Sequence, residues 1–94
     1  MSYSDGRFAV DLGGDTVHAD ELLIATGRSP NTSGLGLEHA GVTVDGRGFI
    51  KVDEHLRTSA RGVFAAGDCN GVQLLSHAAD EMGRTAAWTA LRRP

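Results

Sequence analysis

The first third of the chain alternates apolar and polar positions over short stretches. From Arg7 to Leu12 every second side chain is a large apolar one, and Gly13-Gly14 then separates this stretch from Thr16–Ala19. Alternation with a period of two on either side of a tight turn is typical of a β-hairpin. The next segment, Glu21–Ala25, is a short and mostly apolar run. Since such runs are found in strands covered on both faces, we expect a buried strand there.

The middle of the chain carries a second hairpin signal. Leu35–Ala40 fits one or two helical turns that end at Gly41, because glycine is the commonest residue after a helix. Val42–Val44 and Phe49–Val52 are mostly apolar stretches on either side of Asp45-Gly46-Arg47-Gly48, which favours a turn. The pattern therefore predicts a short helix followed by a hairpin.

The last third predicts one more strand and a long helix. Thr58–Gly62 has the composition of a loop, and Val63–Ala66 is an unbroken apolar run that fits a strand covered on both faces. Apolar residues then recur at helical spacing, which predicts a helix of about five turns over Ser76–Leu91. Strands, hairpins and a long C-terminal helix together indicate an α/β fold, with a domain boundary in the Ser, Pro, Asn and Gly cluster near Ser29–Gly36.

Charge and hydropathy argue against two classes of binding partner, nucleic acids and membranes. The chain has 94 residues, 40% of them apolar, and a formal charge of -3 without a basic stripe, so nucleic acid is not an expected partner. No apolar run approaches the ~20 residues that span a bilayer. The first residues lack the basic start and apolar stretch of a secretory signal. We expect a soluble, cytoplasmic protein with no membrane partner.

The most informative candidate site is the pair Gly67-Asp68. It lies between the apolar run Val63–Ala66 and the predicted helix, and α/β sheets bind ligands beyond the carboxyl ends of their strands. The Asp68 carboxylate can accept hydrogen bonds from ligand hydroxyls, while Gly67 permits close approach to the backbone. Unpaired N–H groups near Leu75 and Ser76 would favour an electron-rich ligand atom. Taken locally, the same residues also fit a plain turn and a plain helix start without a ligand.

Metal and disulfide chemistry have little support in the sequence. Four histidines and the single cysteine Cys69 show no metal-ligand spacing, so we expect no metal site. One cysteine cannot form an internal disulfide or a two-cysteine redox centre. Packing is the simpler role for Cys69.

Four segments together resemble one enzyme family. TSARGVFAAGD, residues 58–68, resembles the second flavin-binding motif of the pyridine nucleotide-disulfide oxidoreductases, and ELLIATGRSPN, residues 21–31, resembles the segment where their chain leaves the NAD(P) domain. Residues 37–59 are similar to the stretch that joins these motifs in dihydrolipoamide dehydrogenases and mercuric reductases. LLSHAADEMGRTAA, residues 74–87, resembles the helix that follows. The resemblance covers nearly the whole chain.

This resemblance implies a fold, two cofactors and specific roles. The fold would be a partial, three-layer, Rossmann-like FAD/NAD(P)-binding fold, with residues 1–30 ending the NAD(P)-binding domain and residues 31–94 forming the C-terminal part of the FAD-binding domain. Asp68 would bind the FAD ribityl chain with Gly67 leaving room, and Leu75 and Ser76 would face the flavin pyrimidine edge. Thr26 and Gly27 would lie where NAD(P) meets the flavin, and the neighbouring Arg28 could instead pair with a carboxylate.

Features of the family that this sequence does not contain limit what it could do alone. It has no Gly-x-Gly-x-x-Gly turn for the FAD pyrophosphate, no cysteine pair and no dimerisation domain. The resemblance therefore implies a fragment of an enzyme that passes hydride from NAD(P)H to FAD and on to a disulfide or other acceptor, inactive without the remaining domains. We also expect homo-oligomers, because uncovered apolar strands invite association. An NADH oxidase or ferredoxin-reductase-like protein, and a cofactor-free self-associating interaction module, are the alternatives.

Overall fold

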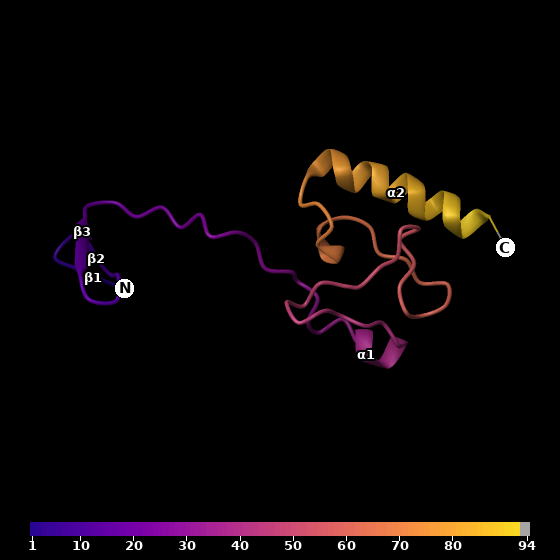
Figure 1. Ribbon diagram of the computed structural model, residues 1–94, viewed down its shortest axis with the longest axis horizontal. Coiled ribbons are helices and arrows are strands. Elements are labelled where there is room, and N and C mark those ends of the chain that lie inside the picture. Colours follow the sequence, from indigo (N-terminus) through magenta and orange to yellow (C-terminus); the bar gives the residue numbers. More distant parts are fainter. Residues whose placement is uncertain (93–94) are drawn as a thin grey trace.

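The computed structural model describes residues 1–92, and Figure 1 shows two regions joined by a long extended segment. We call residues 2–19 the arm, residues 20–29 the connecting segment and residues 30–92 the body. The molecule measures 62 × 29 × 21 Å, and its radius of gyration is 19.3 Å. A compact domain of this length would have a radius of gyration of about 12 Å. The chain is therefore drawn out along one axis.

The arm is a three-stranded antiparallel sheet. Its strands β1 (Ser2–Ser4), β2 (Arg7–Asp11) and β3 (Thr16–Ala19) lie in chain order. The predicted hairpin is confirmed as β2 and β3, whereas β1 was not predicted. In the β1–β2 pair the rings of Tyr3 and Phe8 lie 4.6 Å apart between centroids, a cross-strand contact that favours this register. No arm residue is buried in the part of the chain that the structure describes.

The connecting segment corrects one prediction. Glu21–Ala25 forms no strand and is not buried: Leu23 is 87% exposed and Ile24 is 64% exposed. A strand requires a hydrogen-bonding neighbour, and residues 1–92 place none beside this run. The prediction of a buried strand from apolar composition alone was therefore wrong.

The body begins with a short helix and two aspartate turns of the same design. The helix α1 (Leu37–Ala40) ends at Gly41, as predicted, with the Val42 N–H donating to the Leu37 carbonyl at 2.9 Å. In the first turn, Asp45 Oδ1 accepts from the N–H groups two and four residues later, at 2.8 and 3.0 Å. Asp53 Oδ1 does the same at 2.8 and 3.0 Å. Such bonds make aspartate a turn former.

The fourth residue of each aspartate turn has a positive φ. It is Gly48 in the first turn, with φ 90°, and Leu56 in the second, with φ 62°. Leucine is rarely found in this region of φ, so the second turn is under local strain. Because Leu56 is also buried, the packing of its side chain offsets that strain.

Pairing in the body is sparser than the sequence predicts. The turn at Asp45–Gly48 is confirmed, but the expected hairpin is reduced to one bridge between Val44 and Ile50. Val63–Ala66 is not a strand covered on both faces: only Phe64 pairs, with Arg57, and Val63 and Ala66 are exposed. Again the neighbouring strands that would extend the pairing are absent from residues 1–92.

The core of the molecule lies in the body. Val42, Ile50 and Ala65 form a buried cluster, against which half-buried residues pack, and Phe49 is also buried nearby in sequence. The helix α2 (Ser76–Leu91) runs along the body with the predicted bounds, and Figure 1 shows it as the longest regular element. Ala78 is its buried residue. Among residues 1–92 no helix is long and apolar enough to cross a membrane.

Candidate functional site

The Gly67-Asp68 pair forms a tight turn between the body's apolar run and α2. Gly67 has φ 95° and ψ -162°, a conformation that is open to glycine and costly for other residues. A 3₁₀ turn, Asp68–Asn70, follows, and Gly71 closes it in the left-handed region, with its N–H donating to the Asp68 carbonyl at 3.1 Å. The conformation of this turn thus fixes the backbone position from which the Asp68 side chain extends.

A buried amide holds this turn from inside. Asn70 is only 7% exposed, and its Nδ2 donates to the Ala65 carbonyl at 3.0 Å. Its Oδ1 accepts from the Val72 N–H at 3.0 Å. The sulfur of Met82, on α2, accepts from Asn70 Nδ2 and from the Gly67 N–H, each at 3.4 Å. Buried polar groups need such partners, so these bonds tie the turn to the core and to α2.

Asp68 borders a cavity of about 440 Å³. Three separate parts of the chain line it: Arg28 to Asn31, the residue Phe49, and the residues Asp68, Cys69 and Leu74. Arg28 Nη1 lies 3.6 Å from Asp68 Oδ2, so the end of the connecting segment meets the turn directly. Both side chains are more than half exposed, and solvent screening leaves such a pair a weak contributor to stability.

The cavity brings together acceptor, donor and apolar groups. The Asp68 carboxylate is a hydrogen-bond acceptor, Phe49 and Leu74 offer apolar surface, and α2 begins just after Leu74. No side chain caps the N-terminus of α2 at Leu75, which leaves its first N–H groups for another partner. A ligand with hydroxyl groups, an aromatic face and carbonyl oxygens would match this set of groups.

The structure brings only some of the predicted residues together. Asp68 lines the cavity, and Gly67 precedes it in the same turn. Leu75 and Ser76 are exposed residues that directly follow the lining residue Leu74. Thr26 and Gly27 lie in the exposed connecting segment and do not line the cavity, although Gly27 has φ 113°, which suits glycine.

Sequence reasoning missed several lining residues. Arg28 was expected either beside a cofactor or in an ion pair, and the structure has it in an ion pair with Asp68. Phe49 was assigned to a hairpin only, and Pro30 and Asn31 to the cluster at the predicted domain boundary. No local pattern marks them, because their role depends on a contact between distant parts of the chain. Cys69 lines the cavity, and its thiol lies 3.5 Å from the Ala66 carbonyl.

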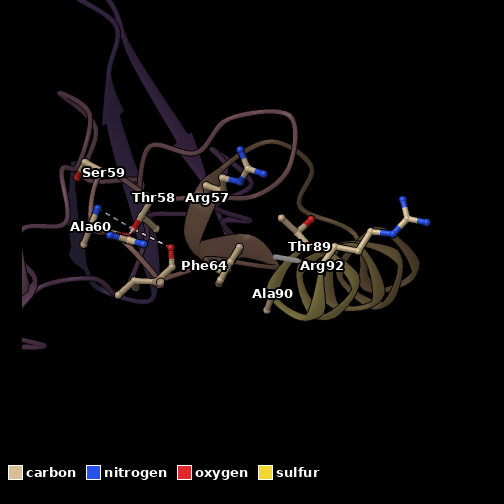
Figure 2. Close-up of a pocket in the computed structure, with 11 residues that line it drawn as sticks. Arg57, Thr58, Ser59, Ala60, Phe64, Thr89, Ala90 and Arg92 are labelled. Atoms are coloured by element: carbon tan, nitrogen blue, oxygen red, sulfur yellow. Dashed lines mark hydrogen bonds between the residues drawn. The ribbon is translucent and has the colours of Figure 1, made fainter. Parts of the chain in front are cut away.

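A larger cavity, of about 830 Å³, lies elsewhere in the body and is shown in Figure 2. The loop from Arg57 to Phe64 and the end of α2, including Thr89 and Arg92, form its lining. Thr58 Oγ1 accepts from the Ala60 N–H and donates to the Val63 carbonyl, so its hydroxyl serves the loop itself. Among residues 1–92, this cavity shares no lining residue with the Asp68 cavity and is lined by no carboxylate. Despite its size, it is the weaker candidate for a site.

Comparison with known proteins identifies the family. A family model described as pyridine nucleotide-disulphide oxidoreductase matches residues 4–83. The mercuric reductase of Acidithiobacillus ferrooxidans is 41% identical over 87 residues, covering 93% of this chain and 16% of that protein. The dihydrolipoyl dehydrogenase of Thermus scotoductus is 50% identical over 76 residues, covering 81% of this chain and 16% of that protein.

A solved structure agrees in fold. The Cu(II) complex of the HOCl-induced flavoprotein disulfide reductase RclA from Escherichia coli matches with a TM-score of 0.81 and 31% identity, over 95% of this chain and 21% of that one. This chain thus spans only about 16% of the length of the curated relatives that it matches. The α/β arrangement is accordingly a partial Rossmann-like fold. With 80 of its 94 residues matched, from residue 4 to residue 83, the chain belongs to the pyridine nucleotide-disulphide oxidoreductase family.

Proposed function

We propose that this chain supplies the ribityl and pyrimidine side of a FAD site in a flavoenzyme that moves hydride from NAD(P)H to FAD and then to a disulfide or other acceptor. The observation that carries the proposal is the Asp68 cavity. A segment and a turn that resemble two different family motifs meet there, joined by the Arg28–Asp68 ion pair. Family membership supports the same conclusion.

The groups around the cavity fit FAD in kind. The Asp68 carboxylate suits the ribityl hydroxyls, because a carboxylate accepts hydrogen bonds. The free N–H groups at the start of α2, by Leu75 and Ser76, suit the carbonyl oxygens of the pyrimidine edge. The positive end of the helix dipole favours negative charge at that edge. When bound, FAD supplies two-electron redox chemistry, and this chain's residues bind and orient it.

The proposal extends to NAD(P) and to the remaining domains. Thr26 and Gly27 stand just before Arg28, and so would lie where a nicotinamide approaches the flavin. We assign residues 1–30 to the end of an NAD(P)-binding domain and residues 31–94 to the C-terminal part of a FAD-binding domain. The exposed apolar run at Leu23 and Ile24 supports this division, because such a run is typical of a strand that neighbouring strands and helices cover. The whole activity then needs partner domains that complete both sites.

A flavin titration tests the FAD assignment on the chain as it is. We expect saturable but weak quenching of flavin fluorescence, with a Kd on the order of 100 µM, because no pyrophosphate-binding turn contributes. Asp68→Ala should weaken binding roughly tenfold or more, as hydrogen bonds to charged groups are among the stronger ones. Asp80→Ala is the matched control, because Asp80 is an exposed carboxylate that pairs with Arg84 on α2. Equal binding by the Asp68→Ala and Asp80→Ala chains would overturn the assignment.

The cofactor-free interaction module is the second candidate, and the exposed connecting segment favours it. Leu23 and Ile24 present apolar side chains and unpaired backbone to a partner strand. Light scattering during the same titration separates the two functions. Self-association together with complete indifference to FAD would support the module, whereas FAD binding that depends on Asp68 would support the flavoenzyme.

A further inference from the structure

Met82 makes an unusual pair of contacts for a methionine. Its sulfur accepts hydrogen bonds from the Gly67 N–H and from Asn70 Nδ2, both at 3.4 Å. A thioether is a weak acceptor, yet Gly67 and Asn70 are buried and their donors need a partner. For the Gly67 N–H, the acceptor is this sulfur. Met82 therefore connects α2 by hydrogen bonds to the turn that carries Asp68.

Met82 also borders a separate cavity. It has a volume of about 240 Å³, and Met82 lines it together with Leu56, Val72 and Ala78. The cavity is open to solvent, because Val72 is 61% exposed and Glu54, also in the lining, is exposed. Since one water molecule takes up roughly 30 Å³ of liquid, a molecule the size of hydrogen peroxide fits easily.

We propose that the Met82 thioether is a modification site that hydrogen peroxide oxidises, and that this oxidation loosens the Gly67–Asp68 turn. The sulfur lone pair attacks one peroxide oxygen, a sulfur–oxygen bond forms and the oxygen–oxygen bond breaks. The sulfur loses two electrons and becomes a sulfoxide, while the other oxygen leaves as hydroxide and takes up the proton that the attacked oxygen gives up, so that it departs as water. One oxygen atom is transferred for each peroxide consumed.

Oxidation changes both contacts of the side chain. The acceptor moves from the sulfur to an oxygen attached to it, so two donors that fit the sulfur must shift. The side chain also becomes polar beside the apolar neighbours Leu56 and Ala78. A shifted turn would carry Asp68 with it and weaken FAD binding, a consequence that rests on the proposed function. The loosening itself does not depend on FAD.

The two methionines of the chain allow a direct test. Met1 is 72% exposed and serves as the internal reference for peroxide reactivity. Trypsin separates them, because Met1 lies before Arg7 and Met82 lies between Arg61 and Arg84. In a Cys69→Ser chain, which removes the thiol, peroxide should add one oxygen to each peptide. Hydrogen exchange at the Gly67 amide should then become roughly fivefold faster, as expected for the loss of one hydrogen bond.

Two variants in the same background decide whether the sulfur is responsible. Met82→Leu keeps an apolar side chain without an acceptor, so its Gly67 amide should exchange at the fast rate before peroxide and show no change afterwards. Met82→Gln carries an oxygen one bond beyond the position of the sulfur, as the sulfoxide does, so its Gly67 amide should exchange at the fast rate of the oxidised chain both before and after peroxide. If Met82→Leu fails to fold, judged by helical circular dichroism, the oxidised chain and Met82→Gln still carry the test.

Two results would overturn the proposal. In the first, peroxide oxidises Met1 but leaves Met82 intact, which means that the cavity gives no access. In the second, Met82 is oxidised while the Gly67 amide keeps its exchange rate, which means that the sulfur does not hold the turn. Neither measurement involves flavin, so a failure here is distinct from a failure of FAD binding in the titration above.

Discussion

The arm and the body differ in strand pairing and in burial. The arm holds all three described strands, β1 to β3, with a regular hydrogen-bonded ladder and no buried residue. Apart from the helices α1 and α2, the body has only two isolated bridges and loops, yet every buried residue of the described chain lies there, from Thr32 to Ala78. Regular strand pairing and a packed core therefore occur in different regions of this molecule.

The difference shows what each kind of interaction needs. A hairpin ladder forms between residues close in sequence, so an isolated arm can adopt it, although small sheets that pack on nothing are only marginally stable in water. A core needs apolar side chains removed from water, each contributing about 1.5 to 3 kcal/mol. We expect the body to unfold cooperatively and the arm to open at little cost in free energy. Three pairs of substitutions probe this contrast.

The largest effect should come from a methyl group added at a glycine. Gly71 has φ 69°, and a Cβ there would lie 2.6 Å from Cγ of the buried Phe49 ring. Strain and overpacking together should cost about 3 to 4 kcal/mol for Gly71→Ala. Gly13→Ala in the arm is the matched control: its φ of 86° is strained, but nothing lies within 4 Å of the added atom.

Urea unfolding followed by helical circular dichroism measures this comparison, because α2 belongs to the body. Gly13→Ala should leave the α2 transition where it is and cost the arm about 1 kcal/mol. The signal of Tyr3, the only tyrosine, reports that loss from β1. Equal shifts of the α2 transition in both variants would show that arm and body unfold as one unit.

The second effect compares two isoleucines. Ile50 is buried in the core cluster, and Ile50→Ala should lower the free energy of unfolding of the body by about 3 kcal/mol through lost burial and a residual cavity. Ile24 lies exposed in the connecting segment, so Ile24→Ala should change it by less than about 0.5 kcal/mol. The same urea titration measures both. A large loss from Ile24→Ala would reveal packing of the connecting segment in solution, on a second copy of the chain or on the body.

The smallest effect concerns pH and lies entirely in the body. The pKa of Asp53 is lowered chiefly because its carboxylate accepts a hydrogen bond from the Arg57 N–H, with a further bond from the His55 N–H. A lowered pKa means that the stabilisation is complete above the unfolded pKa of about 4 and is lost as pH falls through the folded pKa. The urea midpoint of the body should therefore decline slightly as pH is lowered below about 4.

Asp53→Asn keeps an acceptor oxygen but does not titrate, so this part of the decline should vanish. Asp80→Asn, on the exposed side of α2, controls for the loss of one negative charge. The comparison is made as a series of urea midpoints between about pH 5 and pH 3. Identical pH profiles for wild type and Asp53→Asn would contradict a role for the Asp53 turn.

Local patterns predicted the elements that local interactions form. The helix Ser76–Leu91 was predicted with its observed bounds, because alanine-rich sequence at helical spacing favours a helix whatever lies around it. The β2–β3 hairpin and the Asp45–Gly48 turn were also predicted, because alternating apolar residues and turn-forming glycine and aspartate act between residues close in sequence. The candidate site was predicted at Asp68 from a Gly-Asp pair after an apolar run, and Asp68 does line one of the cavities described above, although the run before it does not form the expected strand. That the site residues bind FAD stays a prediction.

Features that depend on distant contacts were not predicted. Glu21–Ala25 has the composition of a strand but no partner, and pairing is a property of two segments. A carboxylate partner for Arg28 was expected as one alternative, but neither its identity as Asp68 nor the Met82 sulfur bonds could be predicted from local patterns, because these contacts join residues far apart in the sequence. The positive φ of Leu56 is equally hidden, since only burial makes it tolerable in place of the glycine used at Gly48.

The extended connecting segment also exposes the chain to cleavage by proteases. Exposed backbone without pairing is where proteases cut first, and Arg28 near its end offers trypsin a suitable bond before Ser29. One brief digestion at that bond would release the arm and leave every buried residue on the other piece. The molecule thus carries its own cleavage point for obtaining the body by itself.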